Sequence, residues 1–188
     1  QFSERYPRIK LDISASESPV DLARREADFA IRALPLEKRP PKDIVGIKLG
    51  PISIGYYVHQ ALLSSAARGL QEMSHISASP QRLSLGTLAS AKDLGLSSRH
   101  VIDGLIPRLS AVKSKLGVAV LPCFLIENIA YITRLPGVPS VRWGHVWMLH
   151  HKDLRQSARI RALFEQFMLL EQNWPAAWDT SAVSVRTV

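Results

Sequence analysis

The stretch "RIKLDISASESPVDLARREADFAIRAL", Arg8–Leu34, decides the fold class of this chain. Apolar and polar residues alternate from Ile9 to Ile13, which is typical of a half-buried strand. A helix is predicted to follow, because Ser18 can cap it and Pro19 suits its first position. The run "DFAIRAL" then predicts a second strand. Strand, helix and strand within about thirty residues predict a βαβ unit with parallel strands.

A second unit of the same kind is predicted around "VIDGLIPRLSAVKSKLGVAVLP". Asp103 is placed to cap its helix, Gly117 to end it, and "VAVLP" predicts a buried strand. The run "HVWMLHH" predicts one more strand, and a capping-box pattern that starts at Asp153 predicts a last helix. The sequence therefore predicts two α/β halves, although residues 73–98 give no clear pattern.

The composition favours one compact domain or two small lobes. The chain has 188 residues, 46% of them hydrophobic, which is enough for a core. Its net charge of +8 attracts anions but does not choose between nucleic acid, a membrane surface and acidic small molecules. Cys123 is the only cysteine, which favours a reducing compartment such as the cytoplasm. No apolar stretch approaches the ~20 residues of a membrane span, so no membrane partner is expected.

Four segments resemble the effector-binding (regulatory) domain of LysR-type transcriptional regulators. They are "F-x-x-R-Y-P-x-I-x-L" at Phe2–Leu11, "D-L-x-x-x-E-A-D-F-A-I-R" at Asp21–Arg32, "A-V-x-x-x-L-G-V-A-V-L-P" at Ala111–Pro122, and the run from Trp147 to Phe167. Each is weak alone, but four in the right order and spacing are specific. The resemblance implies an α/β, two-lobed, periplasmic-binding-protein-like (type 2) fold. Two crossing hinge strands are expected near Ile52–Tyr57 and Ser140–His145.

The resemblance also implies a division of the chain and a set of partners. Lobe I would combine residues 1–52 with 143–188, and lobe II would be residues 53–142. The family's DNA-reading helix-turn-helix domain has no counterpart in this sequence, and the first strand of lobe I is expected to precede Gln1. The family further implies a homodimer, a tetramer in the full-length protein, and DNA contact only through that N-terminal domain.

A cleft for a small anionic effector is expected between the lobes. Arg32 would lie at the carboxyl end of a parallel strand, where ligands bind in open α/β sheets, and its guanidinium could hold a carboxylate. The alternative is a surface arginine. Helix N-termini near Ser14 and Asp103 offer backbone N–H groups to the same anion. The predicted effector-binding residues are Ser14, Ser16, Arg32, Asp103, Gly104 and Pro122.

Other chemistry has weaker support in the sequence. Cys123 could be a nucleophile or redox sensor at a helix N-terminus, but a small buried residue is the favoured interpretation. Arg155, Arg159 and Arg161 could contact phosphate, although a solvated helix face is favoured. The sequence carries no metal, hydrolase or nucleotide motif, so no catalysis, metal or cofactor is expected. A transport-type solute-binding protein of the same fold and an enzyme using Cys123 remain as alternatives.

Overall fold

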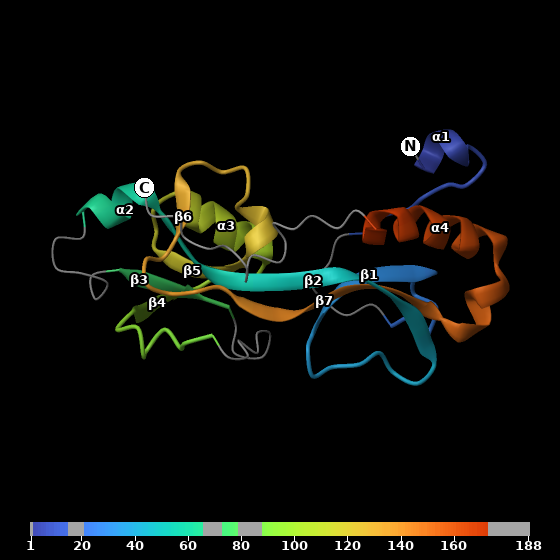
Figure 1. Ribbon diagram of the computed structural model, residues 1–188, viewed down its shortest axis with the longest axis horizontal. Helices are drawn as coiled ribbons and strands as arrows, with labels where there is room; N and C mark the ends of the chain where they lie inside the picture. Colours follow the sequence, from blue (N-terminus) through green and yellow to red (C-terminus); the bar gives the residue numbers. More distant parts are fainter. Residues whose placement is uncertain (1, 15–20, 66–72, 79–87, 173–188) are drawn as a thin grey trace. The chain divides into compact units, whose positions relative to one another are not determined.

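The computed structural model describes residues 2–14, 21–65, 73–78 and 88–172 (Figure 1). Its helices and strands, in chain order, are α1 (Phe2–Arg5), β1 (Phe29–Pro35), β2 (Ile44–His59), α2 (Gln60–Ser65), β3 (Ser74–Ser77), β4 (Ser97–Val101), α3 (Leu105–Lys113), β5 (Val118–Pro122), the short 3₁₀ helix η2 (Cys123–Leu125), β6 (Ile132–Arg134), β7 (Val141–His151), the 3₁₀ helix η3 (Lys152–Gln156) and α4 (Ala158–Gln172).

The described residues divide into two compact units. The first combines the chain up to Gly50 with Gly144 to the end of α4, and the second runs from Pro51 to Trp143. Strands β2 and β7 are long enough to contribute to both units. Which residues form the regulatory lobes stays a prediction.

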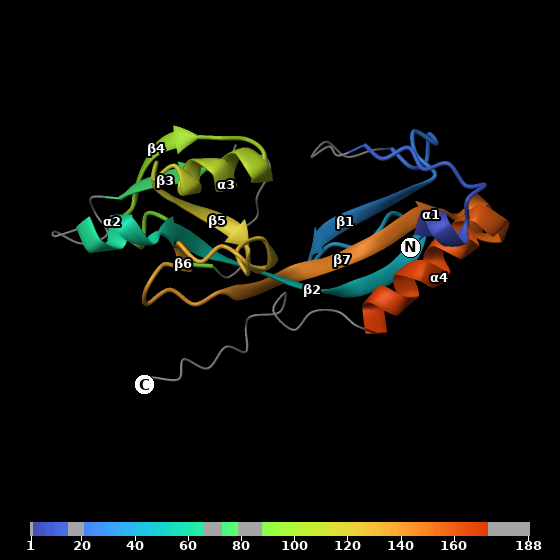
Figure 2. The same cartoon turned by 90° about the horizontal axis from the view of Figure 1, so that it is seen from above.

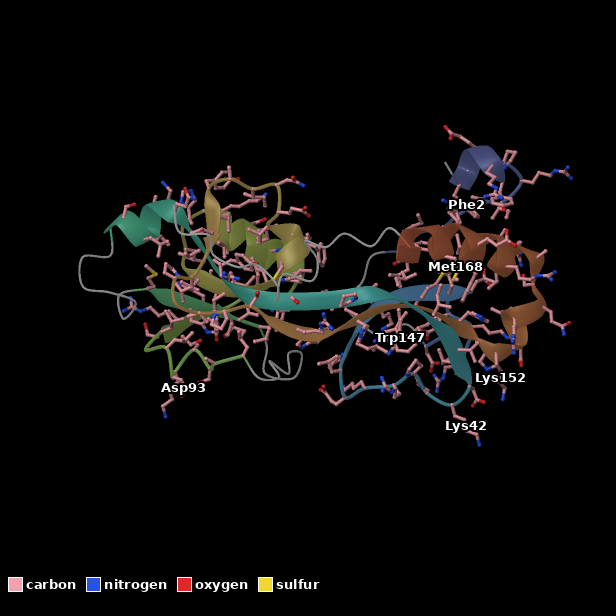
Figure 3. The ribbon with its side chains drawn as sticks, viewed as in Figure 1. Phe2, Lys42, Asp93, Trp147, Lys152 and Met168 are labelled. Carbon is pink, nitrogen blue, oxygen red and sulfur yellow. The ribbon has the colours of Figure 1, made fainter. Side chains whose placement is uncertain are left out.

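In the first unit, helix α4 covers one face of the part of the sheet formed by β1, β7 and β2 (Figure 2). Its strand order is β1–β7–β2, and β1 runs antiparallel to β7 with Phe29 opposite His150. The predicted amphipathic helix is confirmed as α4, whose Leu163 packs with Leu49 and Met148 in the buried core. Phe2 of α1 is partly buried against this core (Figure 3). The core is small, because most of its apolar side chains are only partly buried.

The second unit contains the parallel strands that the sequence predicts. Its strand order is β2–β5–β3–β4, β6 pairs with β2, and β3 is parallel to both β4 and β5. Helix α3 connects β4 to β5, so the predicted βαβ unit is confirmed, with β3 lying between its two strands. The sequence missed β3 because Ser74–Ser77 is short and lies in the Ser-rich stretch. Leu109 and Val112 of α3 pack on this sheet.

The predicted first βαβ unit is wrong. Residues 9–13 form no strand, and Ile13 is 80% exposed. A strand needs a neighbour for its backbone groups, and no described segment pairs with this one. Strand β1 is confirmed, but its partner β7 is antiparallel to it.

The prediction of a helix before β1 is also wrong for the described residues. Ser18 and Pro19 lie outside the described residues, and the chain from Asp21 to Glu26 forms turns. The Asp21 carboxylate accepts hydrogen bonds from the backbone N–H groups of Ala23 at 2.9 Å and Arg24 at 3.1 Å. Such local bonds stabilise a turn in competition with a helix.

Two predicted helix ends differ from the structure. Gly104, with a φ of 94°, is the N-cap of α3 and not Asp103. The helix ends at Lys113, and Lys115 takes the left-handed conformation expected at Gly117. Gly117 instead lies where a Cβ atom would overlap the carbonyl oxygen of Ser74.

The last helix also begins later than predicted. Asp153 lies in the 3₁₀ helix η3, whose first residues are capped by the His151 side chain. The α-helix follows, because the Ser157 carbonyl accepts a hydrogen bond from the Arg161 N–H at 3.0 Å. The capping-box prediction at Asp153 is therefore wrong.

Candidate functional site

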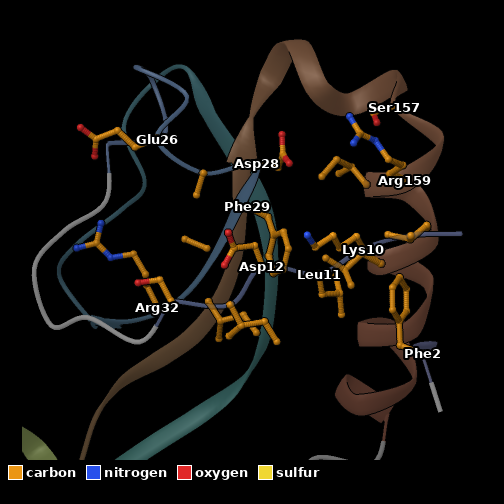
Figure 4. A pocket seen from close by; sticks show the side chains of 18 residues that line it. Phe2, Lys10, Leu11, Asp12, Glu26, Asp28, Phe29, Arg32, Ser157 and Arg159 are labelled. Carbon is orange, nitrogen blue, oxygen red and sulfur yellow. The ribbon is translucent and has the colours of Figure 1, made fainter. Parts of the chain in front are cut away.

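A groove of about 610 Å³ lies within the first unit (Figure 4). Residues 9–14 form one wall, residues 26–32 form the other, and α4 contributes Ile160 and Leu163. Two of the residues predicted to bind an effector, Ser14 and Arg32, line this groove. Ser16 lies outside the described residues.

Arg32 lies in the middle of β1, and not at the carboxyl end of a parallel strand as predicted. The reason is that β1 continues to Pro35 and pairs antiparallel with β7. Arg32 is half-buried, and it forms no ion pair with any carboxylate in the described part of the chain. A half-buried guanidinium retains five N–H donors, which fit a carboxylate in a bidentate pair.

Arg32 shares its face of the sheet with an aromatic ring and a second cation. Trp147 is its partner in the β1–β7 register, and directly opposite residues of an antiparallel pair lie on one face. The Lys48 ammonium lies 5.3 Å from the Trp147 ring centroid, within cation–π distance. Two cations on either side of an indole can attract an anion. The sequence did not reveal this row, because it depends on the strand register.

Among the described residues, the charges that line the groove cancel. Three acidic side chains, Asp12, Glu26 and Asp28, stand against three basic ones, Lys10, Arg32 and Arg159. The groove as a whole therefore offers no field that would hold a polyanion. Any preference for a small anion depends on the local position of Arg32.

The remaining predicted site residues lie in the second unit. Asp103 and Gly104 follow β4 and precede α3, and Pro122 is the last residue of β5. Since β4 and β5 are both parallel to β3, their carboxyl ends meet at one edge of the sheet. Ser77 ends β3 at this edge, and its hydroxyl donates a hydrogen bond to the His100 carbonyl at 3.2 Å.

Three buried side chains with polar groups, Tyr56, His75 and Arg108, lie in the second unit. The Tyr56 hydroxyl donates to the Ala89 carbonyl at 3.0 Å, and the Tyr56 ring meets the His75 ring edge-on at 5.8 Å. Burial, and then the positive charge of Arg108, lower the pKa of His75 below its usual 6.5. Arg108 itself is only 5% exposed. His75 is therefore neutral at physiological pH.

Cys123 is 4% exposed at the start of η2, as the favoured interpretation predicts. Burial, and then the Cys123 thiol as hydrogen-bond partner, raise the pKa of Tyr57. The neighbouring phenol is therefore not a base that could activate this thiol.

The described residues contain no group of three metal-ligating side chains close enough to hold an ion. No helix in this part of the chain is both long and apolar enough to cross a membrane. Arg155 in η3 and Arg159 and Arg161 in α4 are exposed, and Arg159 also lines the groove.

Solved structures of similar fold are regulatory domains of transcription factors. The effector domain of AmpR from Pseudomonas aeruginosa superposes with a TM-score of 0.72 at 18% identity, over 92% of this chain and 86% of that one. The regulatory domain of CrgA from Neisseria meningitidis gives a TM-score of 0.73 at 21% identity, over 93% and 88%. Full-length CrgA matches 93% of this chain but only 62% of its own length, with a TM-score of 0.73 at 20% identity.

The sequence itself points to the same group. A search of curated proteins found no significant match. The family model described as the LysR substrate binding domain matches residues 1–169. Such domains have the periplasmic-binding-protein-like type 2 fold, so the predicted α/β fold class is confirmed. The chain belongs to the LysR substrate binding domain family.

Proposed function

We propose that this chain senses a small anionic effector and that Arg32 binds the effector's negative group. The observation that carries this proposal is the half-buried Arg32 guanidinium, which lines a groove without an ion pair to a described carboxylate. Trp147, opposite Arg32 in the β1–β7 register, lies on the same face of the sheet, so we expect a carboxylate attached to a planar group to suit the site best. Ser14 can add a hydrogen bond from the opposite wall.

The family fixes the general role. As a LysR substrate binding domain, the chain is the effector-sensing regulatory domain of a bacterial LysR-type transcription factor. This role fits the chain better than transport by a solute-binding protein. An effector shifts such a domain between states only through its different affinity for them, and the shift is passed on to DNA binding.

Several finer points belong to the same proposal. Ser16, Asp103, Gly104 and Pro122 stay predicted effector-binding residues. The chain acts in the cytoplasm without catalysis, cofactor or metal, forms homodimers, and forms tetramers in the full-length protein. DNA is contacted only through the N-terminal domain of the family.

A thermal-shift screen of carboxylates tests the proposal. A ligand present at a hundred times its Kd stabilises the folded chain by about 2.7 kcal/mol. For a chain of this size that raises Tm by roughly 5–10 °C. An Arg32→Ala variant is expected to lose most of this gain for every carboxylate that stabilises the parent.

Arg39→Ala is the matched control. It removes the same charge from an exposed loop residue that does not line the groove, and should respond like the parent. If Arg32→Ala and Arg39→Ala respond alike to every carboxylate, Arg32 is only a surface arginine and the proposed site is wrong.

A further inference from the structure

We propose that the sheet face opposite α4 binds a planar dianion, with Arg32 holding one negative group and Lys48 the other. This inference rests on the proposed binding of an effector by Arg32. It adds a second charge on the ligand and the residue that recognises that charge.

The alternation of side chains along the strands places three of them on this face. Met148 of β7 is buried beneath α4, so its neighbour Trp147 points to the other side of the sheet. Leu49 of β2 packs in the same core, so Lys48 points away from α4 as well. Arg32 of β1 is directly opposite Trp147 in the register and shares its face.

This face carries two cations and no acidic side chain among the described strand residues. By alternation, its positions are Ala30, Arg32, Leu34, Gly46, Lys48, Gly50, His145, Trp147 and Leu149. Neither Arg32 nor Lys48 forms an ion pair with a carboxylate in the described part of the chain. The face therefore differs from the groove, whose lining charges cancel, and it favours a ligand with two negative charges.

The position of Trp147 between the two cations favours a planar ligand. Strands β1 and β2 flank β7, so the strands that carry Arg32 and Lys48 lie about 9.6 Å apart. Trp147 and Arg32 are half-buried and Lys48 is exposed, so a ligand can reach all three. A ligand that extends from Arg32 to Lys48 must cross the indole, and a flat ring can stack on it.

Lys48 can leave the indole when such a ligand binds. Its ammonium lies 5.3 Å from the Trp147 ring centroid. The residues two before and two after it, Gly46 and Gly50, carry no side chain that would restrict it. A cation–π contact at an exposed site is weaker than a charge-assisted hydrogen bond to a carboxylate. An anion should therefore draw the ammonium away and uncover the indole for stacking.

Calorimetric titration of the whole chain with benzoate and terephthalate at low ionic strength tests the inference. Both probes present a flat ring and a carboxylate to Arg32, but only terephthalate has a second carboxylate at the opposite end. The parent should bind terephthalate about 5-fold more tightly, the upper range for an exposed ion pair. Because exposed charges are screened, this preference should shrink as salt is added.

One variant and one control assign the preference to Lys48. Lys48→Met keeps the length of the side chain and removes its charge, so terephthalate should bind no more tightly than benzoate. The affinity for benzoate should stay as in the parent. Lys113→Met removes the same charge from an exposed position of α3 in the other unit and should keep the full preference.

A third probe tests the planarity of the ligand. The compound trans-1,4-cyclohexanedicarboxylate carries the same two charges on a ring that is not flat. It should bind the parent more weakly than terephthalate, and Trp147→Leu should remove this difference. Equal binding of the two dianions to the parent would contradict stacking on Trp147.

Several outcomes would overturn the inference. They are equal affinities of the parent for benzoate and terephthalate, a preference that survives in Lys48→Met, and no binding of terephthalate at all. The proposed function fails by a different result, namely an Arg32→Ala variant that responds to every carboxylate like Arg39→Ala. The two failures are therefore distinguishable.

Discussion

The substitution Gly46→Ala is expected to destabilise the first unit strongly. Gly46 lies in β2 where β7 passes very close. A Cβ atom at this position would overlap the Met148 carbonyl oxygen and lie 2.9 Å from both the Met148 carbonyl carbon and a Leu149 methyl group. Backbone atoms of a paired strand cannot move aside cheaply, so the strands must separate locally.

The size of the effect follows from two costs. Overpacking in a well-packed region costs about 1–3 kcal/mol. Strand separation also weakens a ladder hydrogen bond, which contributes about 1 kcal/mol. The expected loss of about 2–4 kcal/mol corresponds to a Tm lower by roughly 5–15 °C.

Urea and thermal unfolding of the parent, Gly46→Ala and Gly55→Ala measure this effect. Gly55 is the matched control in the same strand, because its Cβ would meet Ser140 at an ordinary 3.4 Å. Alanine is also intrinsically better than glycine in a strand, so Gly55→Ala should change stability by less than about 1 kcal/mol. Equal stabilities of the two variants would refute the close approach of β2 and β7 at Gly46.

Three further predictions concern titratable groups. Since the pKa of His75 is lowered by burial and Arg108, the unfolded chain binds a proton below pH 6.5 that the folded chain does not. Stability to urea should therefore fall as the pH drops below 6.5, less steeply in His75→Gln; equal slopes would contradict the burial of His75. Cys123 is buried and should react with Ellman's reagent only after unfolding. Rapid reaction in the folded chain would instead support the alternative that Cys123 is a reactive thiol. The Lys152 ammonium lies 2.6 Å from the Asp43 carboxylate and lowers the pKa of Asp43 below 3.8. In an NMR titration of Lys152→Met, the pKa of Asp43 should therefore rise toward 3.8. No rise would mean that the ion pair is absent in solution.

The sequence predicts those helices and strands whose apolar periodicity is visible within their own residues. Strand β5 and helix α4 carry their own apolar periodicity; β5 is found over the predicted residues, and α4 is found with a later start. The ends of α3 depend on single backbone conformations, the positive φ of Gly104 and of Lys115, which periodicity does not report. Strand β3 was missed because its four residues include two serines and gain their place only between β4 and β5.

The site was predicted less well, and the reason is again pairing. Arg32 was assigned to the end of a parallel strand, but the antiparallel partner β7 places it in mid-strand opposite Trp147. The row of Arg32, Trp147 and Lys48 joins three strands, and β7, which carries Trp147, is far from the other two in sequence. Only the register brings these side chains together, so no local motif could have identified them.

The failed strand prediction for residues 9–13 has a physical meaning for the groove. Alternation of apolar and polar side chains shows that a segment can serve as a strand, but a strand is stable only when its backbone groups are paired. Here the alternating segment and the edge of β1 face the same groove, and the described chain pairs neither of them across it. As a result, Ile13 and Ile31 on these two walls stay 80% and 47% exposed, so the alternation of residues 9–13 records a capacity for pairing that the described chain does not use.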